Sequence, residues 1–192
     1  MRILAVASEV APWAATGGLA DVVAALPAAL VAAEPTARVA TVVPLYRAAR
    51  QRLADAGIVL GAGRGLVLPI GQEVWAVTVR PAAGLWFVEC DPLFDRDGLY
   101  GDADGRDHVD NPLRFAVLAR AALAAAPTIL DGEPDVIHGH DWQGSLAVAY
   151  AALDGLPAAR VMTIHNLAYR GLCGKDWVPR LGLPWSVFDP RH

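Results

Sequence analysis

Short apolar runs alternate with longer segments of helical periodicity along this chain. The runs have the length and composition of strands and cover residues 3–7, 39–43, 74–79, 85–90, 136–138 and 161–164. Helical patterns fill residues 19–33, 46–56, 112–126 and 144–153. Several runs lack the apolar/polar alternation of a half-exposed strand, as expected where both faces of a sheet are covered. The alternation predicts an α/β fold with a Rossmann-like, doubly wound and mostly parallel sheet.

One part of the sheet is expected to be antiparallel. We place this antiparallel part around the turn region at residues 61–68 and the hairpin at residues 74–90, where Pro81 to Gly84 supply the turn. The glycines at 61, 63 and 65 precede a short strand containing Pro69 rather than a helix, so we interpret them as a loop. Residues 91–110 form a long polar loop, and loops of that length are often functional.

The last stretch of the chain is rich in large apolar residues. Trp177, Trp185, Val187 and Phe188 follow the final strand, with no closing helix or strand expected. We expect these side chains to pack against something outside the sequence, which would make the chain part of a larger protein.

Composition narrows the class of protein. A length of 192 residues is typical of one domain, and a net charge of −4 with 55% hydrophobic residues favours a folded core over disorder. Residues 19–33 are interrupted by Asp21 and Pro27, so no transmembrane helix is expected, and without a signal-peptide pattern we expect a cytoplasmic protein. Scattered arginines and a pI of about 5.7 argue against nucleic-acid binding. Cys90 and Cys173 are far apart, as expected of reduced thiols.

The first polar segment that could carry chemistry follows the first strand. Thr16 can cap a helix that starts near Gly18, and Gly17 and Gly18 let backbone N–H groups approach a ligand closely. A helix N-terminus favours an anion such as phosphate. The segment matches neither the dinucleotide nor the P-loop fingerprint, and a plain tight turn remains the alternative.

The second segment combines His138, His140 and Asp141 at a strand end. Alternation places both histidines on one face, an arrangement also found in metal-dependent hydrolases. That interpretation needs further ligands at neighbouring strand ends. The alternative is one buried, hydrogen-bonded histidine beside one that faces a ligand.

The third segment begins with His165 and Asn166, directly after the strand at residues 161–164. A histidine there can hydrogen-bond a sugar hydroxyl or polarise a carbonyl. Because the carboxyl ends of parallel strands share an edge, we expect all three segments to converge on one crevice.

Four ordered motifs resemble the N-terminal half of bacterial glycogen synthases and plant starch synthases. They are Thr16–Val22, Asp110–Phe115, His138–Trp142 and Thr163–Gly171, and the resemblance extends from Met1 to at least Trp185. It implies a retaining glycosyltransferase of the GT-B fold, which moves glucose from ADP-glucose to the non-reducing end of an α-1,4-glucan without a metal or other cofactor. Residues 1–192 would then be the acceptor-side domain, and the C-terminal nucleotide-binding domain would be absent.

The resemblance also implies roles for individual residues. It puts the backbone of Gly17 and Gly18 near the sugar diphosphate, Asp21 and Asp141 around the glucosyl and acceptor site, and His165 against the donor glucose. Asp141 and His165 are the catalytic candidates. The further substrate-binding candidates are Ala15, Phe94, His140, Asn166 and Arg170.

Three positions depart from the family pattern. Ala15 stands where the family has a lysine, Phe94 where related enzymes often have a tyrosine, and Arg170 where glutamine is common. Losing the lysine removes a charge that would face the leaving diphosphate, and Arg170 could restore it. These departures leave open a non-catalytic sugar- or glucan-binding module, alongside the metal-dependent hydrolase built on His138 and His140.

Overall fold

One seven-stranded sheet organises the part of the chain that the computed structural model describes, residues 1–188. The strand order across it is β3-β4-β5-β2-β1-β6-β7. The strands are β1 (Arg2–Val6), β2 (Arg38–Pro44), β3 (Arg64–Ile70), β4 (Glu73–Ala82), β5 (Leu85–Glu89), β6 (Val136–His140) and β7 (Ala159–Thr163). The helices are α1 (Gly18–Ala33), α2 (Arg47–Asp55), α3 (Asp91–Phe94), α4 (Asn111–Ile129), α5 (Asp141–Leu153), α6 (Trp177–Arg180) and the 3-10 turn η1 (Trp185–Phe188).

The sheet is parallel at its centre and antiparallel at one side. β1 pairs in parallel with β2 and β6, β2 pairs likewise with β5, and β6 with β7. β3, β4 and β5 form two consecutive antiparallel hairpins. In the second hairpin Ala83 and Gly84 have φ values of 51° and 74°, and a two-residue type I′ turn needs positive φ at both positions. This arrangement confirms the mostly parallel sheet with an antiparallel part. The turn region expected at residues 61–68 is wrong in its second half, because Gly65 lies in β3 and pairs with β4.

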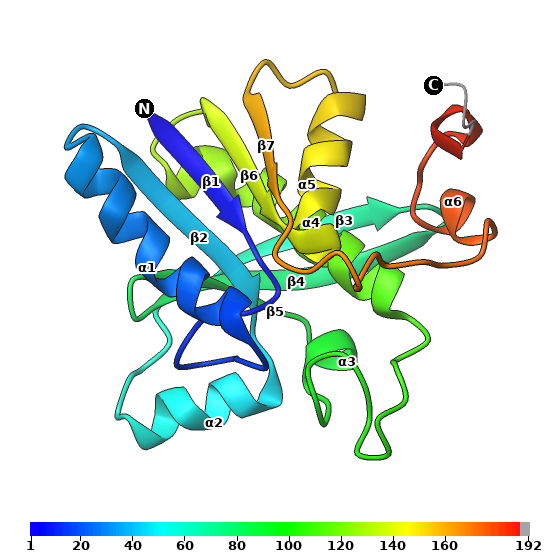
Figure 1. Ribbon diagram of the computed structural model, residues 1–192, viewed down its shortest axis with the longest axis horizontal. Helices are drawn as coiled ribbons and strands as arrows, with labels where there is room; N and C mark the ends of the chain where they lie inside the picture. The colour runs from blue at the N-terminus through cyan, green and yellow to red at the C-terminus, as the bar shows by residue number, and fades with distance from the viewer. Residues whose placement is uncertain (189–192) are drawn as a thin grey trace.

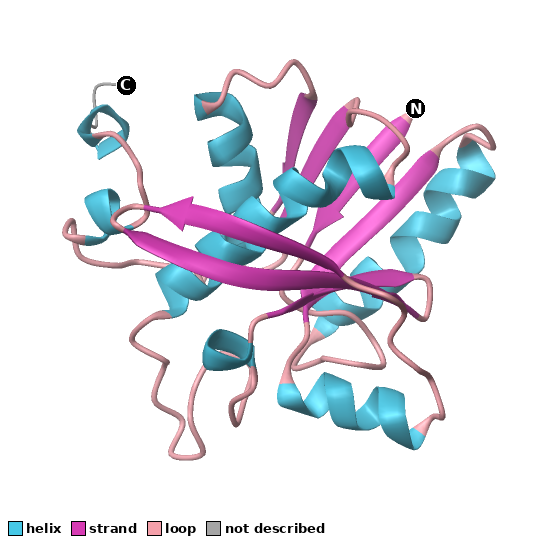
Figure 2. Ribbon diagram, turned by 180° about the vertical axis from the view of Figure 1, so that it is seen from behind, coloured by secondary structure: helices cyan, strands magenta, loops and turns pink. Residues whose placement is uncertain are grey.

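Helices cover both faces of the sheet. α1 lies on the face toward the viewer in Figure 1 and packs against β2. α4 lies on the other face, where it contacts all the strands from β1 to β5, and α5 packs beside it against β6 and β7. Figure 2 shows the long β3–β4 hairpin passing over α4. α4 is therefore enclosed between this hairpin and the parallel strands.

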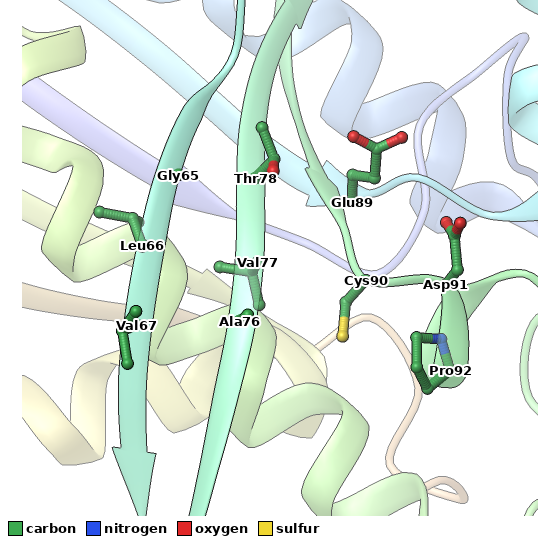
Figure 3. A pocket seen from close by; sticks show the side chains of 10 residues that line it. All are labelled: Gly65, Leu66, Val67, Ala76, Val77, Thr78, Glu89, Cys90, Asp91 and Pro92. Carbon is green, nitrogen blue, oxygen red and sulfur yellow. The ribbon is translucent and has the colours of Figure 1, made fainter.

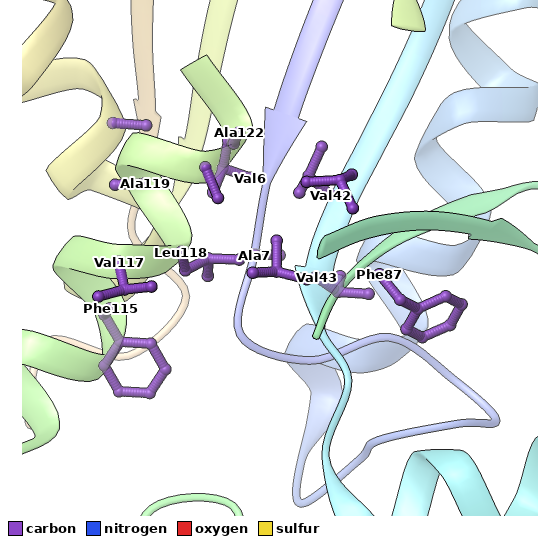
Figure 4. Packing of buried hydrophobic residues seen from close by; sticks show 14 of the residues in the cluster. Val6, Ala7, Val42, Val43, Phe87, Phe115, Val117, Leu118, Ala119 and Ala122 are labelled. Carbon is purple, nitrogen blue, oxygen red and sulfur yellow. The ribbon is translucent and has the colours of Figure 1, made fainter. Parts of the chain in front are cut away.

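The core lies where α4 meets the central strands (Figure 4). Val6, Val42, Phe87, Phe115 and Leu118 are all fully buried there, and burying each such side chain contributes roughly 1.5–3 kcal/mol. By length and composition α4 could cross a membrane, but 61% of its most apolar 18-residue stretch is buried inside the protein. This burial is typical of the core helix of a globular domain.

The structure corrects three sequence-based expectations about the elements. The helix expected at residues 144–153 begins at Asp141, because the chain enters α5 directly from β6. The loop expected at residues 91–110 contains α3 and an isolated bridge between Gly101 and Asp107. The C-terminal stretch forms α6 and η1, although Trp185, Val187 and Phe188 remain exposed there. Of the two free thiols, Cys90 is buried and Cys173 is exposed.

Candidate functional site at the carboxyl edge of the sheet

The carboxyl ends of three neighbouring parallel strands meet at one edge of the sheet. These strands are β1, β6 and β7, and their ends lie toward the lower part of Figure 1. The segments that follow them are residues 7–17, the start of α5 at Asp141, and residues 164–176. The three motif segments therefore share one edge, as the sequence predicts, and ligands of open α/β sheets bind at such an edge.

A buried carboxylate organises the segment after β1. Glu9 is only 4% exposed. It accepts hydrogen bonds from the Thr16 backbone N–H (2.5 Å) and hydroxyl (2.7 Å), and a longer one from the Gly17 N–H (3.4 Å). The N-cap of α1 is Gly17, which makes no side-chain cap hydrogen bond. The prediction that Thr16 caps α1 is thus wrong, because its hydroxyl is bound to Glu9.

The same carboxylate ties this segment to the distant loop before α4. The Tyr100 hydroxyl donates to Glu9 Oε1 at 2.6 Å and lies 2.7 Å from the Ser8 hydroxyl. Burial, reinforced by Tyr46 and Glu9, raises the pKa of Tyr100 far above its usual value. The hydroxyl is consequently protonated at every physiological pH and remains a donor to the Glu9 carboxylate.

The start of α5 places Asp141 across from the segment after β7. Asp141 has a φ of 50°, a left-handed conformation that aspartate tolerates better than most residues. Its Oδ1 accepts hydrogen bonds from the backbone N–H groups of His165 (2.7 Å) and Asn166 (3.4 Å). Asp141 thereby holds the chain at the point where it leaves β7.

Two glycines bring these segments close together. A Cβ on Gly144 would overlap the carbonyl oxygen of Val6, so only glycine lets α5 begin directly against β1. Gly171 has a φ of 63°, and a Cβ there would overlap the ring of Trp142. The segment after β7 is therefore folded back against the first turn of α5.

Three histidines form a row at the ends of β6 and β7. The His138 and His140 rings are 4.2 Å apart at their centroids, and His140 Nδ1 shares a hydrogen bond with His165 Nε2 at 3.0 Å. His138 Nε2 lies 2.7 Å from the hydroxyl of Thr163. Burial, with His165 nearby, lowers the pKa of His138. Burial and the two neighbouring histidines lower the pKa of His140 to about 3, so this ring is neutral at pH 7.

The structure brings together four of the predicted site residues: His140, Asp141, His165 and Asn166. The other predicted site residues include a separate group whose members are all exposed. This group lies on the segment after β1 and the first turn of α1, and consists of Ala15, Gly17, Gly18 and Asp21. An added Cβ at either Gly17 or Gly18 would meet nothing within 4 Å, which leaves their backbone open to a ligand. Arg170 is exposed on the segment after β7.

Two of the predicted substrate contacts are buried instead. Phe94 is 0% exposed, because α3 turns its ring inward against Tyr46, 5.8 Å away between centroids, and beneath the Arg114 guanidinium. His140 is 1% exposed, with the His138 ring against it and its own edge hydrogen-bonded to His165, rather than at the surface. Neither side chain can touch a ligand in this structure, so for both positions the predicted direct contact is corrected to a place inside the protein.

The His138/His140 pair lies on one face, as alternation predicts, but the two rings lie against each other at an interplanar angle of 31°. Within residues 1–188 no group of three or more His, Cys, Asp or Glu side chains is arranged to hold a metal ion. The further ligands that the hydrolase interpretation needs are not brought together in this part of the chain.

A separate groove of about 480 Å³ lies between the β3–β4 hairpin and the end of β5 (Figure 3). Its lining includes Thr78, Glu89 and Asp91, and none of the predicted site residues. Burial opposes the ionisation of Glu89, yet hydrogen bonds from Arg80 and Arg50 hold its pKa below the usual value. Both oxygens of this carboxylate already have partners, so the groove offers a ligand little unpaired charge.

Sequence reasoning did not single out Glu9 and Tyr100. Ser8 and Glu9 are a polar pair directly after an apolar strand, and that position was the available signal. Tyr100 lies 91 residues further along the chain, so nothing local indicates that it reaches Glu9. Arg114 is likewise buried, and it donates to the carbonyls of Leu93 and Leu99, fixing the loop that carries Tyr100.

The sheet order and the strand-end segments define an open, mostly parallel α/β domain with its candidate ligand site at the carboxyl edge of the sheet. Comparison with known proteins identifies the family. The starch synthase catalytic domain family matches residues 2–192, and the chain belongs to that family. The glycogen synthase of Anaeromyxobacter dehalogenans strain 2CP-C is 47% identical over 98% of this chain and 39% of its own length. The glycogen synthase of Granulibacter bethesdensis is 43% identical over the same shares of the two chains.

A solved structure supports the same assignment. The catalytic domain of starch synthase IV from Arabidopsis thaliana, bound to ADP and acarbose, matches with a TM-score of 0.72 and 26% identity. The match covers 98% of this chain and 38% of that one. It confirms the fold class expected of a GT-B glycosyltransferase. The chain thus spans about two fifths of the length of the relatives that it matches.

Proposed function

We propose that this chain is the N-terminal, acceptor-side part of a glycogen or starch synthase. The reaction is transfer of glucose from ADP-glucose to the non-reducing end of an α-1,4-glucan, with retention of configuration. The observation that carries this proposal is the joining of the His138–Trp142 and Thr163–Gly171 motifs through Asp141 and His165 at the carboxyl edge of the sheet, in a chain of the starch synthase family.

In this proposal the exposed backbone at Gly17 and Gly18 approaches the diphosphate of the donor. Glu9 and Thr16 hold that segment in place, and the N-terminus of α1 contributes partial positive charge. His165 faces the donor glucose, and Asp141 and Asp21 border the glucosyl and acceptor positions. Asn166 and Arg170 complete this wall of the site.

The remaining three fifths of a full-length relative would supply the other wall. Developing charge on the departing diphosphate needs fixed positive groups, and the oxocarbenium-like transition state needs polar groups on both sides. The exposed face at Ala15 to Gly18 provides no cationic side chain. We therefore propose that a second, nucleotide-binding domain completes the site, and that the enzyme works in the cytoplasm.

The test uses the full-length parent enzyme and the 192-residue chain side by side. Each is incubated with ADP-glucose and a maltooligosaccharide, with and without EDTA, and new glucosyl linkages are measured. We expect the parent to extend the acceptor with α-linkages regardless of EDTA, and the 192-residue chain to extend nothing. A parent that binds glucan without transferring glucose would support a binding module instead, and cleavage of the acceptor that EDTA abolishes, in place of extension, would support the metal-dependent hydrolase class.

A further inference from the structure

His140 has a position that neither ligand contact nor simple packing explains. It is the last residue of β6 and only 1% exposed, and the centroid of the His138 ring lies 4.2 Å from its own. Its polar contact in residues 1–188 is the 3.0 Å hydrogen bond between its Nδ1 and His165 Nε2. The rings lie at only 27° to each other, as suits a hydrogen bond between two ring edges. Its Nε2 is buried without a partner among the described residues.

The hydrogen bond permits two arrangements of protons on two neutral rings. In one, His140 Nδ1–H donates to His165 Nε2, and the unpartnered Nε2 of His140 carries a lone pair. In the other, His165 Nε2–H donates to His140 Nδ1, and the unpartnered nitrogen is a buried N–H. Buried N–H groups without an acceptor are rarer in proteins than acceptors without a donor. The first arrangement is therefore favoured.

A positively charged His140 would also leave a buried N–H group without an acceptor. Protonation would put an N–H on both ring nitrogens, so Nε2–H would again be buried without an acceptor. The groups that face the ring are His138 on β6 and His165 after β7, and neither is an anion that could stabilise a positive charge. The lowered pKa of His140 agrees with this geometry.

We propose that His140 is a positioning residue that holds His165 in the Nδ1–H tautomer. His165 then presents a hydrogen-bond donor, rather than an acceptor, on the side of the ring away from His140. The backbone of His165 is fixed independently by Asp141, so the ring position and its proton are set by two adjacent residues of one motif. That the donor faces a glucose hydroxyl rests on the proposed function.

The tautomer can be measured directly without substrate. The chain contains five histidines, and long-range ¹H–¹⁵N correlation spectra distinguish a ring nitrogen that carries a proton from one that does not. In the wild-type chain at pH 7.5 we expect His165 to have a protonated Nδ1 and a bare Nε2. A neutral histidine free in water prefers the opposite form, so a wild-type His165 with a protonated Nε2 would overturn the proposal.

Two substitutions of His140 distinguish a role in setting the His165 tautomer from a role in packing alone. In His140→Asn the amide can donate from nearly the place of Nδ1, and we expect His165 to keep its Nδ1–H form. In His140→Leu the donor is lost, and we expect His165 to change to the Nε2–H form; an unchanged tautomer would overturn the proposal. Backbone amide spectra verify the fold of each variant, and if His140→Leu fails to fold, the wild-type tautomer still decides.

The consequence for turnover is measured in the full-length parent. We expect His140→Leu to lower kcat at least tenfold with a smaller effect on KM for the acceptor, and His140→Asn to recover most of the rate. If the tautomer changes while kcat is unaffected, the positioning role stands and the proposed role of His165 in transfer fails. The two proposals are therefore tested separately.

Discussion

At the scale of single residues, the site depends on backbone groups that are held by buried side chains. Glu9 holds the segment before α1, and Asp141 holds the segment after β7. Asp141 does this from a left-handed backbone conformation, a kind of local strain found most often at functional sites. Both carboxylates thus hold backbone segments at the candidate site in place.

The first prediction concerns stability against pH. His140 is neutral in the folded protein down to a pKa of about 3, whereas in the unfolded chain its pKa is about 6.5. Below pH 6.5 the unfolded state therefore binds more protons, and the free energy of unfolding falls as the pH falls, by at most about 1.4 kcal/mol per pH unit for this histidine. His138 acts in the same direction.

His140→Asn should remove this contribution. Urea unfolding of wild type and variant between pH 7.5 and pH 5 should give a stability difference that moves by about 2 kcal/mol in favour of the variant as the pH falls. Contributions from carboxylates cancel in this difference. Two curves that remain parallel over the whole range would contradict the assigned environment of His140.

A second prediction concerns the absence of a cationic side chain between Ala15 and Gly18, where we propose that the diphosphate binds. Ala15 is exposed beside Gly17 and Gly18, so a lysine there would face solvent and cost little stability. In the full-length parent, Ala15→Lys should raise kcat/KM for ADP-glucose, within the ~10²-fold that one such electrostatic contact is worth.

Arg170 provides the internal control for that experiment. If Arg170 already supplies the charge, the gain from Ala15→Lys will be small in the parent and larger in an Arg170→Gln background. Initial rates of the parent, both single variants and the double variant measure this coupling. No gain in either background would mean that position 15 does not face the diphosphate.

At the scale of elements, close approach between α5 and β1 determines where the site residues lie. Because Gly144 lies directly against the Val6 carbonyl, α5 begins at the end of β6 and carries Asp141 to the edge of the sheet. The β1–β6–β7 adjacency then brings the segment with His165 within reach. Helix position and sheet order together therefore make the contact between Asp141 and His165, which lie 24 residues apart in two different motifs.

The Gly144→Ala substitution tests this geometry, because helix propensity and steric overlap predict opposite changes in the free energy of unfolding. Helix propensity alone predicts that Gly144→Ala stabilises α5 by up to about 1 kcal/mol. The overlap with Val6 predicts a loss of about 1–3 kcal/mol, as in other overpacked sites. We expect the loss, measured by urea unfolding. The matched control is Gly65→Ala, because a Cβ at position 65 would meet nothing within 4 Å, and this variant should change stability little. A Gly144→Ala variant as stable as wild type would contradict the packing account.

The same contacts explain how far the sequence could predict the site. The parallel strands, their shared edge and the convergence of His140, Asp141 and His165 follow from periodicity and motif position alone. The burial of Phe94 does not, because it depends on the four-residue helix α3 and on Tyr46 and Arg114, which are distant in the chain. The Glu9–Tyr100 contact is similarly non-local, since its partners lie on a strand end and on an irregular loop.

At the scale of the whole molecule, the described residues form one continuous core with the candidate site along one edge of its sheet. The groove between the β3–β4 hairpin and the end of β5 is the competing location for a ligand. It is lined by residues outside all four motifs, so the two locations can be tested separately by substitution. The central claim is that the edge formed by β1, β6 and β7 takes part in glucosyl transfer and that the groove does not.

The most direct test of that claim is the initial rate of glucosyl transfer from ADP-glucose in the full-length parent carrying His165→Ala or, as a matched control in the groove, Thr78→Val. Removing one positioned polar group from a transfer site typically costs ~10²–10³ in rate. We predict that His165→Ala lowers kcat by about that factor in an enzyme that remains folded, at a cost of about 1–3 kcal/mol in stability because buried His140 loses its hydrogen-bond partner, and that Thr78→Val leaves the rate within about twofold. A His165→Ala enzyme with wild-type kcat, or a Thr78→Val enzyme that loses transfer while remaining folded, would contradict the account.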